Sequence, residues 1–149
     1  MTLNKYLECW LEDNVKLNCK YNTYDTYKKL INEHVKNTVG IYTIKQLDTY
    51  LMQNFINNMY KSGFSKSTLE LVKNMLSGAF KCAIQTYNLI NLNPVQYVKI
   101  PKYPTSTEIK DKVLTLEQFN KLLELAPVGT DLYIPFEIGF HTGMRRGKY

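Results

Sequence analysis

The chain has 149 residues, 44% of them hydrophobic and 21% charged, which suits one globular domain, or one small domain plus part of another. It contains no apolar run of membrane-spanning length, and its N-terminus lacks a signal-peptide core, so we expect a cytoplasmic protein with no membrane partner. Its three cysteines and two histidines share no metal-ligand spacing, which predicts free thiols and no metal site.

The net charge of +6 is unevenly distributed along the chain. Residues 1–103 hold 13 Lys or Arg and 7 Asp or Glu, whereas residues 104–149 hold 6 of each kind. The excess therefore favours a polyanionic partner for the first two thirds of the chain. The only arginines are Arg145 and Arg146, and lysine makes good point contacts to phosphate but poor bidentate contacts to bases.

Three amphipathic segments precede the longest one. The first helix is expected to begin after Thr2 and to run to about residue 15, and residues 18–23 are expected to form a loop. A second helix is predicted over about residues 23–36, with His34 on or beside its buried stripe as a core histidine. Thr43 is expected to start the third helix, which Gly63 ends.

The longest segment, residues 64–94, is predicted to form one long helix. Ser67 and Glu70 have the spacing of a capping box at its start, and Pro94 closes it. Apolar residues at helical spacing predict a buried face: Leu69, Val72, Leu76, Ala79, Phe80, Ala83, Ile84 and Tyr87. The opposite, polar face is either solvated or contacts phosphates and base edges.

A second part follows a stretch that contains Pro101 and Pro104. Residues 104–112 are polar and are predicted to be an exposed linker. Thr115 and Gln118 then have capping-box spacing, and Asp131 is expected to cap another helix. Residues 113–149 are too few for an independent core.

The order of these segments resembles the phage-integrase family of tyrosine recombinases. LNKYLECWLED, NTYDTYKKLINEHVKNTVG and YTIKQLDTYL resemble the first three segments of the family's core-binding domain. FSKSTLELVKNMLSGAFKCAIQTYNLINLNPVQYVKIPK resembles its long helix and exit, the most characteristic stretch. VLTLEQFNKLLELA resembles the first helix of the catalytic domain, and HTGMRRG resembles its Thr-Gly-x-Arg motif.

The resemblance implies an all-α fold: a small four-helix, SAM-like core-binding bundle in residues 1–103, the linker, and in residues 113–149 the first helices of a truncated catalytic domain. It implies duplex DNA as the partner, further recombinase protomers on that DNA, and neither a metal nor another cofactor. Arg145 matches the family's first catalytic arginine, whose guanidinium suits a bidentate grip on phosphate. Lys148 stands where the family usually has an acidic residue. Tyr149 is not expected to be the nucleophile, so we expect no catalysis by this chain alone.

The DNA contacts are expected on the second helix and on the polar face of the long helix. The candidates are Thr23, Lys28, Lys29, Lys66, Ser67, Thr68, Lys73, Asn74 and Lys81. The lysines are expected to meet phosphates, and Asn74 is expected to meet a base edge, because Asn can pair bidentately with adenine. For each of them a solvated surface position is the alternative. For the whole chain, the alternative is a helical protein-interaction module that assembles with an intact recombinase.

Overall fold

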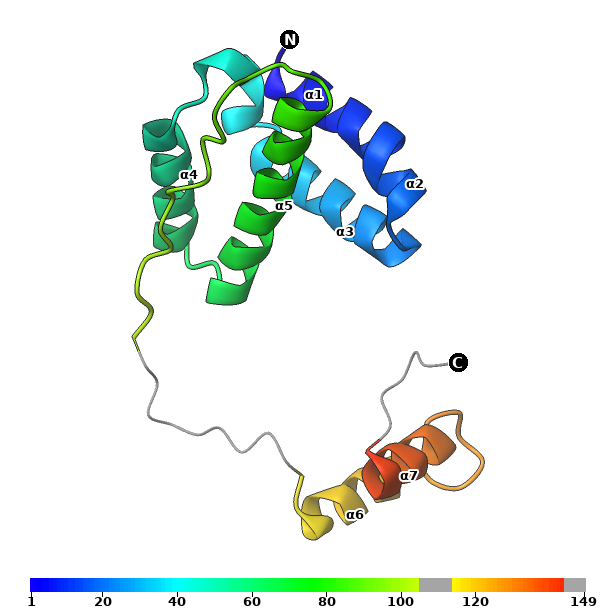
Figure 1. Ribbon diagram of the computed structural model, residues 1–149. Helices are drawn as coiled ribbons and strands as arrows, with labels where there is room; N and C mark the ends of the chain where they lie inside the picture. Colours follow the sequence, from blue (N-terminus) through cyan, green and yellow to red (C-terminus); the bar gives the residue numbers. More distant parts are fainter. Residues whose placement is uncertain (105–113, 144–149) are drawn as a thin grey trace. The chain divides into compact units, whose positions relative to one another are not determined.

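The computed structural model describes residues 1–104 and 114–143 (Figure 1). The chain separates into two compact units, with the division between Pro104 and Thr105. The described residues are helical, with one isolated β-bridge between Thr2 and Thr43 and no strand. None of the helices in these residues is long and apolar enough to cross a membrane. The expected all-α fold class is therefore confirmed.

The first unit is built from four helical rods (Figure 1). The first rod joins α1 (Leu3–Trp10), the π-helical turn η1 (Leu11–Val15) and α2 (Lys16–Asn18), and the second joins α3 (Tyr21–Leu30) and the π-helical turn η2 (Ile31–Val35). The short 3-10 helices η3 (Val39–Ile41) and η4 (Ile44–Gln46) lead to the third and fourth rods, α4 (Thr49–Lys61) and α5 (Lys66–Gln85).

The helix α5 is the centre of the bundle. The faces that the other rods turn toward it are apolar, so one continuous core forms, and its most completely buried side chains include Leu7, Met52, Leu76 and Phe80. Within this core the Tyr6 hydroxyl donates a hydrogen bond of 2.6 Å to the carbonyl oxygen of Ala79. Burial raises the pKa of Tyr6, so this phenol stays a neutral donor that joins α1 to α5.

Several predicted helix boundaries were wrong. The cap of α5 is Ser65, whose side chain accepts from the Thr68 amide, so Ser67 lies inside the first turn. The helix ends at Gln85, because the chain reverses at Asn88, whose φ is 49°, a left-handed conformation that asparagine tolerates. The buried face extends from Leu69 to Ala83, while Ile84 is only partly buried and Tyr87 is exposed.

The earlier segments differ from the prediction in a similar way. The first rod continues past Val15 to Asn18, and the second begins at Tyr21, so the predicted loop over residues 18–23 is reduced to a tight turn. Thr43 caps only the short η4, and Asp48 caps α4 through a 2.8 Å bond from the Leu51 amide. The side chain of an N-cap residue satisfies amides of the first turn only, so each of these helices needs its own cap.

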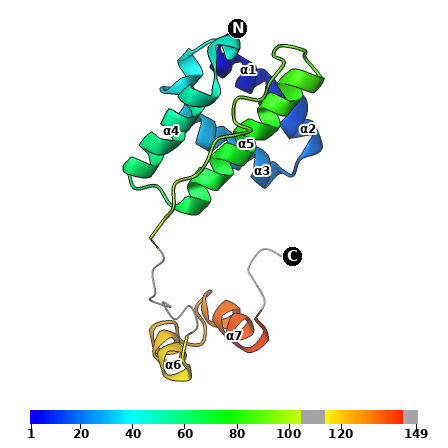
Figure 2. The same ribbon diagram turned by 60° about the vertical axis from the view of Figure 1, so that its left-hand side comes forward.

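After α5 the chain returns along α4 as an extended strap, residues 91–103, which we call the exit segment (Figures 1 and 2). The Gln53 side chain of α4 pairs with the backbone of Lys99 through two hydrogen bonds of 2.8 Å. Val95 and Val98 are buried in the core, and the Tyr103 hydroxyl donates to the Phe64 carbonyl oxygen at 2.6 Å. The exit segment is therefore part of the packed bundle.

The second unit contains α6 (Leu116–Leu125) and α7 (Tyr133–Thr142). The predicted capping box at the start of α6 is confirmed, because the Thr115 and Gln118 side chains bond each other's backbone amides. The predicted cap of α7 was wrong: Leu132, not Asp131, precedes the helix, and it makes no side-chain cap. The rings of Phe119 and Phe140 stack with centroids 3.9 Å apart and join the two helices.

Candidate nucleic-acid interface

The polar face of α5 is the part of the first unit where the predicted contact residues come together. Successive helical residues are offset by about 100°, so the side chains of Lys66, Lys73, Asn74 and Lys81 project within one third of the circumference. That sector lies beside the sector buried in the core, and Lys73, at the border between the two, is partly buried. The α5 surface outside the core is thus the one that carries the candidate cations.

A hollow of about 440 Å³ lies between this face and the exit segment, and we call it the α5 hollow. From α5 it is lined by Lys73, Asn74, Ser77, Lys81 and Ile84, and from residues 91–96 by Asn91, Leu92, Asn93, Val95 and Gln96. The structure therefore brings three of the predicted residues together in one concave site with both polar and apolar lining residues. Concave surfaces lined by cations concentrate a positive potential toward an anionic ligand.

The lysines of the α5 hollow differ from the other candidate lysines in their partners. Within the described parts of the chain, Lys73 and Lys81 form no ion pair. By contrast, Lys29 pairs with Asp25 at 2.8 Å and Lys66 approaches Glu70 at 3.8 Å. Among the candidate lysines in the described residues, those of the hollow are therefore more available to an external phosphate than Lys29 and Lys66.

The predicted residues of α3 divide between two sides of that helix. Thr23 faces α5, where it lines a shallow hollow together with Asn22, Thr26, Tyr27 and Leu71. Lys28 projects elsewhere, with its ammonium 5.7 Å from the centre of the Tyr24 ring, and the Tyr24 hydroxyl in turn donates to Glu12 of the first rod. Of these two residues, Thr23 is adjacent to α5 and Lys28 belongs to a separate surface.

The predicted residues at the start of α5 are held by local hydrogen bonds. The Ser65 hydroxyl lies 3.0 Å from the Ser67 hydroxyl and 2.9 Å from the Thr68 hydroxyl. Ser67 is exposed and Thr68 partly buried, in a helix N-terminus that also presents free backbone amides. These side chains could meet a phosphate at the end of the polar face of α5.

The exit-segment side of the hollow was missed by sequence reasoning. Asn91, Leu92, Asn93 and Gln96 fell in a stretch that was interpreted as the end of a helix followed by a linker. The available signal was compositional: three amide side chains in six residues next to a proline are typical of a structured turn rather than of a helix end. Their proximity to Lys81 depends on the chain reversal at Asn88.

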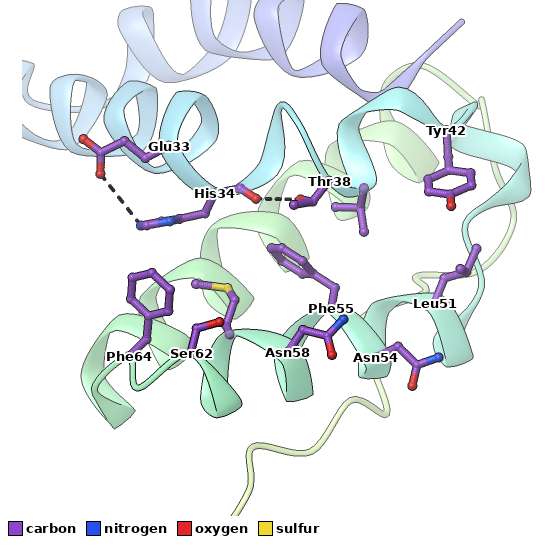
Figure 3. A pocket seen from close by; sticks show the side chains of 12 residues that line it. Glu33, His34, Thr38, Tyr42, Leu51, Asn54, Phe55, Asn58, Ser62 and Phe64 are labelled. Carbon is purple, nitrogen blue, oxygen red and sulfur yellow. Dashed lines mark hydrogen bonds and ion pairs between the residues drawn. The ribbon is translucent and has the colours of Figure 1, made fainter.

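A second hollow, of about 410 Å³, lies between η2 and α4 (Figure 3). His34 lies at its edge, where its ring packs against Phe64 with centroids 4.8 Å apart and its Nε2 is 3.8 Å from Glu33. The lining is mainly apolar, with Tyr42, Phe55 and Asn58 among its residues. Lysine is absent from this lining, so the second hollow is a poor candidate for phosphate. His34 was predicted to be a core histidine on or beside the buried stripe, and the structure places it at the edge of the core, only partly buried.

Two predicted features lie outside this surface. Arg145 and the predicted linker of residues 104–112, apart from Pro104, lie outside the described residues. In the described parts of the chain, no group of three or more His, Cys, Asp or Glu side chains is placed to hold a metal ion.

Parts of this chain are similar to a known protein family and to curated integrases. Residues 2–60 match the family model described as "Phage integrase, N-terminal SAM-like domain". The integrase of Staphylococcus phage L54a is 31% identical over 116 residues, which cover 75% of this chain and 32% of that protein. The chain spans about a third of the length of the curated integrases it matches.

Solved structures share the fold. The phage integrase SAM-like domain from Moorella thermoacetica is 26% identical, has a TM-score of 0.58, and is matched over 70% of this chain and 88% of that one. The Tn1549 transposon integrase, solved in complex with circular intermediate DNA, is 23% identical with a TM-score of 0.68 over 98% of this chain and 47% of that one.

The first unit is therefore an integrase SAM-like domain, an all-helical module. The match of residues 2–60 and the similarity to curated integrases support the resemblance to the phage-integrase family of tyrosine recombinases.

Proposed function

We propose that residues 1–103 are a core-binding domain that grips duplex DNA, as the DNA-binding part of an integrase-like site-specific recombinase. The observation that carries the proposal is the α5 hollow, in which Lys73 and Lys81 form no ion pair within the described residues and lie beside the exposed amide of Asn74. Lysine ammoniums bind phosphates without regard to sequence, and an amide can pair with a base edge. Supporting it from outside the chain, the Tn1549 integrase of the same fold was solved with DNA.

The predicted contacts contribute differently under this proposal. Lys66, Lys73 and Lys81 meet the phosphate backbone along α5, with Ser67 and Thr68 at its N-terminus. Thr23 and Lys29 reach the same DNA from α3, and Lys28 contributes through the general positive potential rather than by direct contact. Asn74 is the residue that meets a base edge. Other recombinase protomers on the same DNA are expected partners.

We further propose that residues 113–149 are the first part of a catalytic domain, with Arg145 as its phosphate-gripping arginine. The helix α7 supports this, because it is rich in large apolar residues, among them Ile134, Phe136 and Phe140, and yet none of its residues is fully buried. Such a helix normally lies inside a larger core.

The alternative function is that of a module that assembles with an intact recombinase. In that case the apolar surface of α7 would be covered by the recombinase and not by further residues of the same polypeptide. We propose that these 149 residues bind DNA without cleaving it.

The test is the salt dependence of duplex binding. If the four lysines Lys29, Lys66, Lys73 and Lys81 meet phosphates, log K falls against log salt with a slope of roughly −3 to −4. The double variant Lys73→Ala/Lys81→Ala should make the slope shallower by about 2, since each phosphate contact contributes about 0.9. Lys16→Ala is the matched control. Lys16 pairs with Glu12 at 2.5 Å and is not among the residues that line the hollow, so its loss should leave the slope unchanged. Salt-independent binding would exclude the proposal.

A further inference from the structure

The exit segment is held rigidly against α5 at the α5 hollow. The Asn93 amide donates to the Ser77 carbonyl oxygen and lies within hydrogen-bond distance of the Ser77 hydroxyl, both at 3.3 Å. The Asn93 side-chain oxygen accepts from the Val95 amide at 3.0 Å, and Pro94 and Val95 are buried. The residues on either side of Asn93 are therefore presented in a fixed position.

Leu92 is the apolar residue among the exposed residues that line the exit-segment side of the α5 hollow. Its side chain is 80% exposed, although it is flanked by two asparagines and lines a hollow that contains two unpaired lysines. An isolated exposed leucine is ordinary on a protein surface. Here, however, the leucine projects from an anchored segment into the site where DNA is proposed to bind.

The polar side chains around Leu92 are not used inside the protein. In the described part of the chain, the side-chain amides of Asn74, Asn91 and Gln96 form no hydrogen bond, whereas Asn93 and Gln53 are both engaged. The α5 hollow thus combines free amides, free ammoniums and one apolar side chain. These are the groups that contact, respectively, base edges, phosphates and the methyl group of thymine.

We infer that the exit segment forms the second wall of the DNA site, and that Leu92 together with Asn74 makes this site select A·T base pairs from the major groove. Asn74 pairs with N6 and N7 of adenine, and Leu92 packs against the 5-methyl group of thymine. Lys73 and Lys81 hold the flanking phosphates. The inference rests on the proposed DNA binding and adds to it a base preference and a specificity residue outside α5.

The test uses three duplexes of equal length and measures dissociation constants at one salt concentration. The first has a mixed A·T sequence. The second has uracil in place of every thymine, which removes only the methyl groups. The third has inosine·cytosine pairs, which keep the minor-groove pattern of A·T and change the major groove. The wild-type protein should bind the uracil duplex about threefold more weakly and the inosine duplex about tenfold more weakly.

Variants separate the two contacts. Leu92→Ala should abolish the difference between thymine and uracil and keep the salt slope. Asn74→Ala should reduce the difference between A·T and inosine·cytosine to about threefold, because the inosine·cytosine duplex also lacks the methyl group that Leu92 contacts. Leu17→Ala is the matched control, because Leu17 is a similarly exposed leucine on α2 and should leave every difference intact. Lys81→Ala should weaken binding to all three duplexes by the same factor.

The outcomes distinguish this inference from the proposed function. Equal binding of the three duplexes with a steep salt slope would overturn the A·T preference and leave DNA binding in place. A thymine preference that persists in Leu92→Ala would also overturn it, since another group would then contact the methyl. Absence of salt-dependent binding to any duplex would overturn the proposed function itself.

Discussion

The two units of this chain bury their apolar side chains to very different extents. In the first unit the core passes through all four rods and takes in the exit segment. In the second unit, over the described residues, only Phe119 and Ala126 are buried, while Leu116, Leu125, Ile134 and others are exposed. Burial of apolar area is the main source of folding free energy, so the first unit holds its own fold. The described residues of the second unit form helices but bury too few apolar side chains to make a hydrophobic core.

The largest expected contrast between the units is in susceptibility to protease. The linker of residues 104–112 is polar and begins at a proline, so trypsin should cleave after Lys110 or Lys112 first and leave a stable piece of residues 1–110 or 1–112. Cleavage after Lys73 or Lys81 requires α5 to open, which should make it slower by roughly a hundredfold or more. Mass spectrometry of early fragments gives the answer. Early cleavage inside α5 would show that the boundary is misplaced.

Truncation of an apolar side chain should lower the free energy of unfolding by several kcal/mol more in the first unit than in the second. Phe80→Ala in α5 removes a fully buried ring and should lower the free energy of unfolding by about 3–5 kcal/mol; Leu76→Ala should lower it by about 2–5 kcal/mol. Leu125→Ala in α6 removes a side chain that is mostly exposed, and should change it by less than about 0.5 kcal/mol. Chemical denaturation measures all three. A loss below about 0.5 kcal/mol in both core variants would mean that α5 faces the other way.

The tightness of the first unit can be tested at two glycines. A Cβ on Gly40 would lie 1.9 Å from the Asn4 side-chain oxygen and 2.8 Å from the Val35 carbonyl oxygen, so Gly40→Ala should cost about 1–3 kcal/mol. A Cβ on Gly78 would meet only Trp10, at 4.0 Å, and Gly78→Ala should stabilise α5 by about 0.4–1 kcal/mol.

The opposite signs make the glycine pair informative when thermal unfolding of both variants is compared. Because Asn4 is the nearest obstacle, Asn4→Ala should recover part of the loss in Gly40→Ala. No recovery in the double variant would assign the clash to the Val35 backbone.

Two tyrosine hydroxyls of the first unit allow a test of how burial changes the contribution of a hydrogen bond to the free energy of unfolding. Tyr6 and Tyr103 each donate to a carbonyl oxygen at 2.6 Å, but Tyr6 is buried in the core and Tyr103 only partly buried on the exit segment. Tyr6→Phe should cost about 1 kcal/mol. Tyr103→Phe should cost less, because water can replace its partner. Equal losses in urea titrations would contradict this dependence on burial.

The smallest expected effect belongs to the second unit. Arg145→Ala should change DNA binding by less than about 1 kcal/mol, the range of an exposed charge contact. These 149 residues should form no covalent adduct with a nicked suicide duplex, because Arg145 alone among them is assigned a catalytic role by the resemblance. The assay looks for a protein–DNA band that resists denaturant. A band that disappears in Tyr149→Phe would contradict this expectation.

The sequence by itself determined the class of fold, the four rods and the buried face of α5. Leu69, Val72, Leu76, Ala79, Phe80 and Ala83 recur at helical spacing, and all are buried. Periodicity is a local property, so it can be recognised without knowing the partner of each face. The same holds for the capping box of Thr115 and Gln118, which involves only a few consecutive residues.

Only the tertiary structure decided the composition of the α5 hollow. Lys81 and Leu92 are joined across a reversal at Asn88, and the wall is fixed by Asn93 bonding Ser77, sixteen positions earlier. In the same way Lys28 carries the charge expected of a contact, yet it lies by Tyr24 and away from the hollow. Charge and residue type are written in the sequence. Which of the charged side chains share a surface depends on contacts between distant segments, and no local pattern specifies these contacts.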